Sequence, residues 1–431
     1  MNATGERSES AQHTGSYYAA SAKHATDYAP LTGEHSADVC VVGAGFTGIA
    51  TALNLVERGY KVHVVEANRV GWGASGRNGG QLIGGISGES KLARKLGTEG
   101  ERRMWELRWA GHDIIRARVQ DYNIDCDLKW GYLDVAIKPR HLREQQQELE
   151  RLQHYEFPYE YRSLGAKETQ ALIGTDAYIG ALMNMGNGHL HPLNLCIGEA
   201  RAAVAQGAAI SEQSPVLHID HGSRARVVTD RGSVTADAVV LAGNAYHFLE
   251  PRLRGHLLPV NSFIIATEPL SQEQVASINP RDLAVCDPNY VLEYFRLSAD
   301  KRLLFGGRCN YSGSDPQHIK SMLRPKMLRI YPQLASVKID YAWGGTIGVT
   351  ANRVPQLGQL AGNVFYAQGY SGHGVNVTHL AGQIMADAVG GTMERMDIFS
   401  CIRPIVIPGA HLLANPLVSL GMFYFQLRDR L

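Results

Sequence analysis

The stretch from Ala37 to Glu66 reads ADVCVVGAGFTGIATALNLVERGYKVHVVE. Its apolar run Val39–Val42 has the pattern of a strand buried on both faces, and the run Val62–Val65 repeats that pattern. Between the two runs, apolar residues recur at helical spacing, and a glycine ends the helix. The stretch therefore predicts a strand, a tight turn, a helix and a second strand in one compact unit.

The turn of this unit is GAGFTG at 43–48, a GxGxxG pattern that directly precedes the helix. Gly43 permits the tight turn, Gly45 lets the backbone approach a pyrophosphate, and Gly48 lets the helix pack closely on the strand. The N-terminus of the helix offers free N–H groups to phosphates. Glu66, at the end of the second strand, can accept hydrogen bonds from a ribose diol, and its charge disfavours the 2′-phosphate of NADP. The pattern predicts a dinucleotide site.

Two further glycine-rich runs lie outside this unit, ASGRNGGQL at 74–82 and GYSGHGV at 369–375. An enzyme that binds only a nicotinamide dinucleotide does not need a second glycine-rich loop after Glu66. The chain also lacks the second GxGxxG unit that is usual in flavoproteins using NAD(P)H. The late turn precedes a helix whose N-terminus can stabilise negative charge on a reduced ring. These features favour a flavin dinucleotide.

The composition excludes several classes of protein. The 431 residues carry 42 Lys+Arg against 41 Asp+Glu, a formal net charge of +1, whereas a nucleic-acid-binding protein has a basic face or tail. The six cysteines form no CxxC pair, which is typical of reduced thiols in a cytoplasmic protein. We expect no secretory signal at the N-terminus and no transmembrane segment, since the apolar run 412–425 is too short to span a bilayer.

Other chemistries find little support. The sequence has no G-x-S-x-G elbow, no P-loop and no HExxH motif. His189 and His191 form an HxH pair, but no further ligands follow at a useful spacing. We expect these histidines to be structural and expect no metal site.

The α/β pattern begins at residue 37, is interrupted by strand-rich sequence and returns near the C-terminus. Residues 89–122 and 141–174 have helical patterns, and a meander of short strands starts at 216. Two intertwined domains fit this order. The expected division is a polar N-terminal segment (1–36), a discontinuous nucleotide-binding domain (37–90, 160–250 and 344–395), a substrate domain (91–159 and 251–343) and a C-terminal apolar segment (396–431).

The combination of DVCVVGAGFTG, ASGRNGGQL, HLHPLNL, LAGNAY and GYSGHGV resembles the D-amino-acid oxidase and sarcosine oxidase (DAO) superfamily of FAD-dependent oxidoreductases. The first motif is generic to many flavoproteins, whereas SGRNGG, GNAY and GYSGHG together are specific. The resemblance runs from SYYAASA at 16–22 almost to the C-terminus. It implies an α/β fold of the DAO/glutathione-reductase type, in which a Rossmann-like FAD-binding domain is intertwined with a β-sheet-rich substrate domain.

The resemblance also implies which residues hold FAD. The residues implied around the pyrophosphate are Gly43, Ala44, Gly45, Thr47 and Gly48; Glu66 and Ala67 would lie at the adenosine ribose; Ala74, Ser75, Arg77, Asn78, Gly79 and Gly80 would follow the phosphates and ribityl chain; Val216 would contact the adenine; Ala242 and Gly243 would close over the dinucleotide; and Gly344, Gly372, His373, Gly374 and Val375 would lie beside the flavin ring. Because the stretch 344–350 contains no cysteine for covalent attachment, we expect non-covalent FAD.

Several members of the superfamily bind a substrate carboxylate through an Arg on a strand of the substrate domain. Arg296 matches that position, and an Arg fork can bind both carboxylate oxygens. Arg308 and Arg353 are alternatives. Three aromatic residues could line a pocket for an amine chain, although each could equally be ordinary core packing: Tyr294, Trp343 and Tyr370.

The subgroup with the fullest match acts on γ-glutamylated putrescine. The resemblance thus implies oxidation of a primary amine on a small γ-glutamylated polyamine, in putrescine degradation, with hydride passing to the flavin. The products would be an aldehyde and ammonia, with hydrogen peroxide if oxygen is the acceptor. The strand at 261–267 lacks the lysine that promotes reaction with oxygen in some sarcosine oxidases, so the acceptor stays open.

Two alternatives remain. One is an oxidase or dehydrogenase of a secondary amine or small amino acid, as in sarcosine and glycine oxidases. The other is a flavoprotein subunit that passes electrons to a partner through the C-terminal apolar segment. A homo-oligomer is compatible with either.

Overall fold

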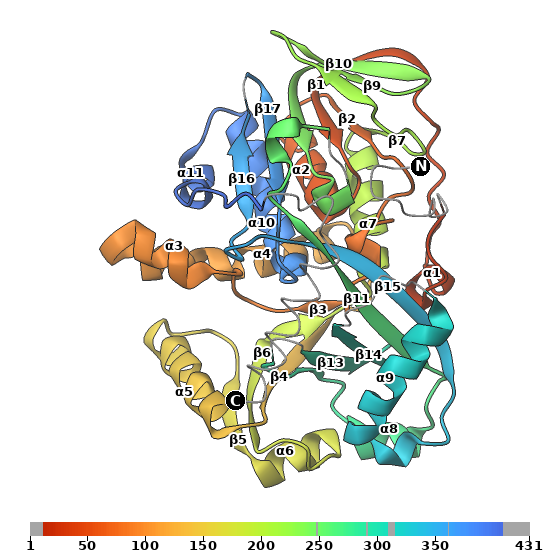
Figure 1. Cartoon of the computed structure of the whole chain (residues 1–431), viewed down its shortest axis with the longest axis vertical. Coiled ribbons are helices and arrows are strands. Elements are labelled where there is room, and N and C mark those ends of the chain that lie inside the picture. The colour runs from red at the N-terminus through yellow and green to blue at the C-terminus, as the bar shows by residue number, and fades with distance from the viewer. Residues whose placement is uncertain (1–11, 247–248, 290–291, 309–314, 361, 408–431) are drawn as a thin grey trace.

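The fold is built around β1 (Gly33–Val42), α2 (Phe46–Val56) and β2 (Val62–Val65), which confirm the predicted strand–turn–helix–strand unit. The computed structural model describes residues 12–246, 249–289, 292–308, 315–360 and 362–407. Every residue of α2 is buried, because the helix lies between its sheet and other helices. Figure 1 shows two halves, the one with β1 and α2 above and a second sheet below.

The first sheet has eight strands, in the order β16-β17-β10-β1-β2-β7, with β9 paired to β10 and β8 paired to β9. β1 pairs in parallel with both β2 and β10, and β10 pairs in parallel with β17. The other strands of this sheet are β7 (Ala209–Ser211), β8 (His218–Asp220), β9 (Ala225–Val228), β10 (Gly232–Leu241), β16 (Gln356–Gln359) and β17 (Val364–Gln368). The meander of short strands predicted from residue 216 corresponds to β8, β9 and the start of β10.

The second sheet has nine strands, in the order β15-β11-β14-β13-β12-β4-β6-β3, with β5 on β6. The long strands β11 and β15 cross between the two halves of the molecule (Figure 1). The bounds are β3 (Gln81–Leu82), β4 (Lys129–Ala136), β5 (Tyr161–Gly165), β6 (Gly180–His189), β11 (Leu258–Thr267), β12 (Ala284–Cys286), β13 (Glu293–Leu297), β14 (Leu303–Arg308) and β15 (Ile339–Val349).

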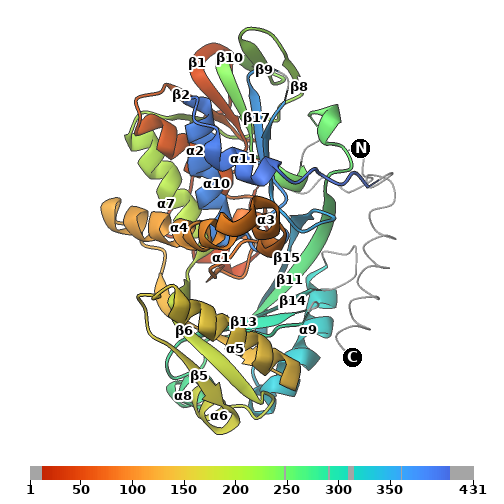
Figure 2. The same cartoon turned by 90° about the vertical axis from the view of Figure 1, so that its left-hand side faces the viewer.

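Helices cover both sheets. Figure 2 shows α2, α7 and α10 against the first sheet, and α5 and α6 on the second. The helices are α1 (Tyr17–Ala20), α3 (Glu89–Leu96), α4 (Gly100–Asp121), α5 (Pro139–His154), α6 (Ala166–Ile173), α7 (Pro192–Ala205), α8 (Gln272–Ile278), α9 (Pro316–Ile330), α10 (Gly374–Val389) and α11 (Glu394–Ser400). No helix in the described ranges has the length and apolar character needed to cross a bilayer.

The sheets divide the chain differently from the expected domain ranges in several places. β3, in the expected nucleotide-binding range 37–90, and the end of β15, in the range 344–395, belong to the second sheet. β5 and β6, within the expected nucleotide-binding range 160–250, belong to the second sheet. The sequence of β6, GALMNMGNGH, looks like a loop because of its three glycines, yet a Cβ at Gly188 would lie 2.1 Å from Lys129 O on β4. The close contact between β6 and β4 explains why position 188 is glycine, and composition alone does not reveal that contact.

A further difference concerns α4, which lies in the expected substrate range 91–159. Its apolar residues join the core around α2 and α10, and Asn376 of α10 donates to Arg108 O at 2.7 Å. His112 Nδ1 lies 3.0 Å from Asn376 Oδ1. The many charges of α4 gave no indication of which domain its apolar side would contact.

Most of the N-terminal segment lies within the described residues, and the C-terminal apolar run does not. Residues 12–36 lie along both halves of the molecule, and Leu31 N donates to Ser214 Oγ at 2.8 Å. At the other end, α11 ends at Ser400, and the apolar run 412–425 lies outside the described residues.

The closest contact in the first half is between α2 and the turn before it. A Cβ at Gly48 would lie 1.9 Å from Gly43 O and 3.3 Å from Val41 Cγ1. No side chain fits there, so Gly48 sets the distance between α2 and β1. The expected role of this glycine in helix–strand packing agrees with the geometry.

We predict that Gly48→Ala lowers the free energy of unfolding by about 3 kcal/mol or more, because overpacking against backbone cannot relax by a side-chain movement. Chemical denaturation of the apoprotein measures the effect. Gly15→Ala is the control, since a Cβ at Gly15 would meet nothing within 4 Å. Equal stability of the two variants would contradict the close contact.

Candidate FAD-binding and active site

The turn after β1 lies against the end of β10. Gly43 has φ +106°, a left-handed conformation that favours glycine, and a Cβ there would be 3.1 Å from the Ala242 carbonyl carbon. Ala242 N donates to Val42 O at 2.9 Å. Ala242 and Gly243 therefore lie directly beside the GxGxxG turn.

The N-terminus of α2 contacts the second glycine-rich run. Gly45 is the N-cap and provides no side-chain cap. Phe46 N donates to Ser75 Oγ at 2.8 Å, and a Cβ at Gly45 would lie 2.9 Å from the same oxygen. The start of α2 and Ser75 form one surface on which backbone N–H groups can meet phosphate oxygens.

Glu66 is held by backbone N–H groups of two turns. One carboxylate oxygen accepts from Ala44 N at 2.6 Å and the other from Asn68 N at 2.8 Å. Burial raises the pKa of Glu66, while these N–H groups act in the opposite direction. Ser214 N donates to Glu66 O at 2.8 Å, which brings the half-buried Val216 near the same end of the sheet. Ala67 is exposed beside it.

The loop Ala74–Gly80 is ordered by its own side chains. Asn78 donates to Ala74 O (3.1 Å) and Ser75 O (2.8 Å), and its oxygen accepts from Gly80 N at 2.8 Å. The guanidinium of Arg77 lies 4.2 Å from the centre of the Trp72 ring. The asparagine fixes the curve of the loop, so its backbone groups are preorganised.

The late turn brings a second helix N-terminus to the same region. His373 is the N-cap of α10 and makes no side-chain cap hydrogen bond. Its Nε2 lies 3.2 Å from Gly84 O, and burial lowers the pKa of His373, so the ring is neutral and donates to this carbonyl. Gly374 and Val375 form the first turn of the helix, and Gly372 is exposed just before it.

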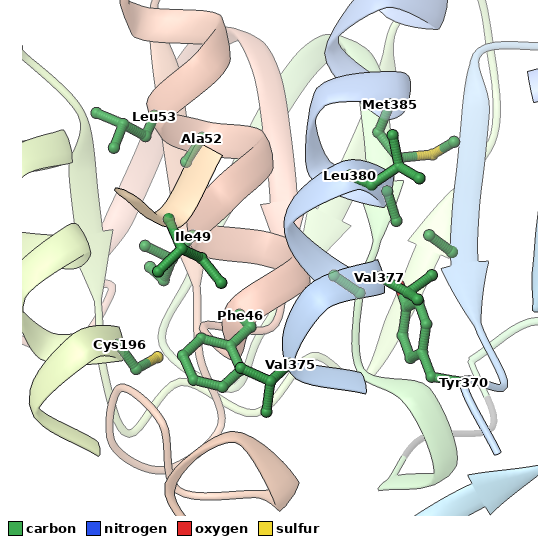
Figure 3. Packing of buried hydrophobic residues seen from close by; sticks show 14 of the residues in the cluster. Phe46, Ile49, Ala52, Leu53, Cys196, Tyr370, Val375, Val377, Leu380 and Met385 are labelled. Atoms are coloured by element: carbon green, nitrogen blue, oxygen red, sulfur yellow. The ribbon is translucent and has the colours of Figure 1, made fainter. Parts of the chain in front are cut away.

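A direct hydrogen bond joins the two glycine-rich turns. Tyr370 OH lies 2.7 Å from Thr47 Oγ1 of α2. Figure 3 shows the two helices packed side by side, with Phe46 and Ile49 of α2 near Val375 of α10. The uncapped starts of α2 and α10 thus lie in one region, although their residues are over 300 apart in the sequence.

The β15 glycines complete this region in an unexpected way. A Cβ at Gly344 would point at the Phe263 ring, 2.8 Å away, in the core of the second half. A Cβ at the next residue, Gly345, would lie 2.9 Å from Arg77 Cβ. Strand alternation therefore places Gly345, rather than Gly344, on the face toward the loop.

Arg296 does not have the environment expected of a substrate ligand. It is 2% exposed, and three backbone carbonyls accept from its guanidinium. Nε donates to Gly79 O (2.8 Å), Nη2 to Leu190 O (2.7 Å) and Nη1 to Leu297 O (3.0 Å). These bonds tie the glycine-rich loop to β13.

The two remaining N–H groups of Arg296 also have acceptors. Nη2 donates to Tyr18 OH at 3.1 Å, and Nη1 lies 3.5 Å from His189 Nδ1. Burial and the Arg296 charge lower the pKa of His189 to about 3, and its Nε2 donates to Asp282 O at 2.8 Å, which leaves Nδ1 as an acceptor. All five N–H donors have acceptors within the protein, which leaves none directed at a substrate carboxylate.

The three aromatic candidates lie around the same loop. Trp343 is buried and its Nε1 donates to Arg77 O at 3.0 Å, so it packs against the loop rather than lining a pocket. Tyr370 is engaged with Thr47. Tyr294 is half-buried, and a Cβ at Gly79 would lie 2.4 Å from its ring. Tyr294 thus remains the candidate that faces both the sheet and the loop.

Of the alternative cations, Arg353 lies near the start of α10. Its Nη2 donates to Ser371 O at 3.2 Å, and its charge contributes to the lowered pKa of His373, for which burial is the main cause. Arg353 and Ser371 both have positive φ, +68° and +54°. The side chain of Arg308 lies outside the described part of the chain.

Both histidines of the HxH pair have contacts within the protein. His191 is the N-cap of α7, where Nδ1 accepts from Asn194 N at 3.1 Å, and Nε2 lies 3.1 Å from Ser21 Oγ. Burial lowers the pKa of His191 to about 3.

The sequence analysis missed a buried charged cluster beneath α10. Glu199 of α7 and His379 of α10 are 0% exposed, and Arg118 of α4 joins them. Glu199 accepts from Arg118 Nη1 at 2.9 Å and lies 3.1 Å from His379 Nε2. His379 Nδ1 lies 2.6 Å from Val375 O. Charged residues on three separate helical patterns carry no signal that they meet.

The pKa of Glu199 is determined by burial and by its two partners in the cluster. Burial alone would raise the pKa of Glu199, but His379 and Arg118 outweigh burial and lower it. Nδ1 and Nε2 of His379 face the oxygen atoms of Val375 and Glu199, respectively. The ion pairs connect α4, α7 and α10 behind the first turn of α10.

The donors of this site fit FAD. Two helix N-termini whose own N-cap residues make no side-chain cap, backbone at Gly43 and Gly45 that no larger residue could replace without contact, and a carboxylate at the end of β2 match the pyrophosphate and ribose of a dinucleotide. The family model "FAD dependent oxidoreductase" (DAO) matches residues 38–388. The chain belongs to this family of FAD-dependent oxidoreductases.

Two relatives are similar to this chain over almost its full length. The chain is 42% identical to γ-glutamylputrescine oxidoreductase of Escherichia coli (strain K12), over 97% of this chain and 99% of that protein. It is 40% identical to the probable oxidoreductase OrdL of Haemophilus influenzae, over 97% and 98% of the two chains.

Solved structures agree on the fold. Glycine oxidase from Geobacillus kaustophilus superposes with a TM-score of 0.70 at 20% identity, covering 84% of this chain and 98% of that one. An L-amino acid deaminase from Proteus vulgaris gives a TM-score of 0.70 at 21% identity, covering 93% and 99%. The predicted fold class is confirmed.

We predict that Glu199→Gln destabilises the protein by about 3–5 kcal/mol at neutral pH, because it leaves the buried guanidinium of Arg118 without its anion. The folded-state pKa of Glu199 is depressed, so its stabilisation is present above the unfolded pKa and is lost as pH falls through the folded value. The difference from wild type should therefore shrink below about pH 4.

The control for this prediction is Glu34→Gln, which removes the exposed ion pair with Arg226. We expect that change to cost less than about 1 kcal/mol. Urea denaturation of both variants across pH provides the measurement, and a Glu199→Gln effect as small as that of the control would show that the cluster contributes little.

Proposed function

We propose that the protein oxidises the primary amine of γ-glutamylputrescine or a close γ-glutamylated polyamine. The observation that carries the proposal is 42% identity to γ-glutamylputrescine oxidoreductase over almost the full length of both chains. The specific loops of the site lie within that match, whereas the glycine oxidases match at about a quarter identity.

The proposed reaction converts the CH₂–NH₂ end of the substrate, with water and oxygen, to an aldehyde, ammonia and hydrogen peroxide. FAD, when bound, supplies the acceptor for the two electrons and the hydrogen of that carbon. The substrate amine reacts in its neutral form, since a protonated nitrogen has no lone pair to assist C–H cleavage. No side chain need act as an obligatory base. Oxygen is the acceptor we propose, and a different acceptor would leave out the peroxide.

We propose that the residues of the two glycine-rich turns hold the cofactor without a covalent bond. The N-terminus of α2 faces the pyrophosphate, Glu66 the ribose and the loop 74–80 the ribityl chain. The start of α10, with neutral His373 as its N-cap, supplies oriented N–H groups where reduction places negative charge on the ring. We propose a cytoplasmic location, which agrees with the free thiols of the described residues.

Arg353 is the cation we propose for the carboxylate of the glutamyl group. It lies beside the start of α10, and two neighbouring residues with positive φ, Arg353 and Ser371, mark this corner of the fold. Backbone conformations of this kind cluster at ligand sites. Arg296 is unsuitable, because all its donors are used within the protein.

The reaction is tested by adding γ-glutamylputrescine to the purified protein without oxygen. We expect the flavin absorbance near 450 nm to bleach, and to recover with formation of peroxide when air is admitted. Sarcosine, glycine and putrescine serve as comparison substrates and should react more slowly. Faster bleaching by sarcosine or glycine would favour the alternative amino-acid oxidase. No bleaching by γ-glutamylputrescine would refute the substrate assignment, and bleaching without recovery in air would point to another acceptor.

For the substrate carboxylate, we predict that Arg353→Ala raises KM for γ-glutamylputrescine roughly tenfold or more, the cost of a lost charge-assisted hydrogen bond, with kcat changed far less. Steady-state kinetics provide the measurement. Arg231→Ala is the matched control, because Arg231 is exposed at the turn before β10 and should leave KM unchanged. An unchanged KM in Arg353→Ala would refute the assignment.

A further inference from the structure

The N-terminal helix α1 is placed by contacts with both halves of the molecule. Tyr17 OH donates to Asp300 Oδ1 at 2.7 Å in the second half. On the other side, Lys23 N donates to Asn194 Oδ1 at 2.9 Å on α7. Figure 1 shows α1 beside β15, and the Tyr17 and Tyr341 rings lie 6.0 Å apart. The family model begins only at residue 38, so these contacts come from outside it.

Tyr18 is the residue of α1 that reaches inward. It is fully buried, and its hydroxyl accepts from Arg296 Nη2 at 3.1 Å. Its ring packs edge-on against Trp343, with the centroids 5.3 Å apart. Tyr18 therefore contacts Arg296 and Trp343, which both donate hydrogen bonds to the backbone of the loop 74–80.

Those two side chains bind the loop through its backbone. Trp343 Nε1 donates to Arg77 O at 3.0 Å, and Arg296 Nε donates to Gly79 O at 2.8 Å. The carbonyls lie two residues apart, so together they fix the position and tilt of that segment. Gly80, with φ +70°, has no room for a side chain, because a Cβ would lie 2.5 Å from Arg296 Nη2.

We propose that Tyr18 is a positioning residue for the FAD-binding loop 74–80, acting through Arg296 and Trp343. The hydroxyl of Tyr18 accepts one N–H of the guanidinium and so holds it in the orientation in which Nε donates to Gly79 O. The N-terminal segment is thereby part of the cofactor site without contacting the cofactor. This inference rests on the proposed placement of FAD at the loop and is independent of the substrate.

The neighbouring tyrosine provides a matched control. Tyr17→Phe removes a hydrogen bond from the same helix, at a contact with Asp300 that does not involve the loop. Tyr18→Phe removes one hydroxyl and leaves the ring that packs on Trp343. Both changes keep the helix and its apolar contacts, so both variants should fold.

The experiment compares FAD affinity, the reduction potential of bound FAD and the thermal midpoint of the apoprotein. We expect Tyr18→Phe to raise the Kd for FAD three- to tenfold, about the effect of one buried hydrogen bond, and to shift the reduction potential. Tyr17→Phe should lower the thermal midpoint of the apoprotein about as much as Tyr18→Phe does. Its Kd for FAD and the reduction potential of its bound FAD should stay at the wild-type values. Titration of apoprotein with FAD needs no amine, so a wrong substrate does not affect the result.

Two results would overturn the proposal. Wild-type Kd and potential in Tyr18→Phe would show that the loop does not depend on the hydroxyl. Equal changes in both variants would show that α1 contributes only general stability. A wild-type protein that binds no FAD would overturn the placement of the cofactor as well.

Discussion

The site depends on holding together two helix N-termini whose own N-cap residues, Gly45 and His373, make no side-chain cap. α2 and α10 start in glycine-rich turns, and the bond between Thr47 and Tyr370 joins them at 2.7 Å. A helix end without partners is costly when it is buried, and an anionic ligand removes that cost. The close contact at Gly48 and the ion pairs of Glu199 both serve to keep these two ends in place. The ability to bind a dinucleotide therefore depends on the packing at Gly48 and around Glu199 as well as on the turns themselves.

The sequence predicted most of this half of the molecule, for reasons that are local. The strand at 39–42, the GxGxxG turn and the following helix form one continuous pattern, and each glycine in it answers a steric requirement. The late turn at 369–375 was equally visible, because a buried strand precedes it and an amphipathic helix follows. The parts that periodicity and glycine chemistry determine were predicted correctly.

The errors concern contacts between distant segments. Arg296 lies on a strand with the right alternation for a ligand, but whether its guanidinium is free depends on Gly79, Leu190 and Tyr18, which no local pattern connects to it. The glycine-rich strand β6 and the charged helix α4 were placed in the wrong half for the same reason. The cluster of Glu199, Arg118 and His379 was invisible because each member lies on a different helix.

The order of strands has a consequence for how the chain is made. β1 is synthesised early, yet its partner β10 lies some two hundred residues later, and β17 comes later still. The contacts of the N-terminal helix α1 with Arg296 and Trp343 likewise form only after those residues have been synthesised. During translation the first strand and helix therefore emerge from the ribosome long before the surfaces that bury them exist, and non-local pairing of this kind is slow. The emerging chain therefore exposes the apolar faces of β1 and α2 until β10 and α10 have been synthesised.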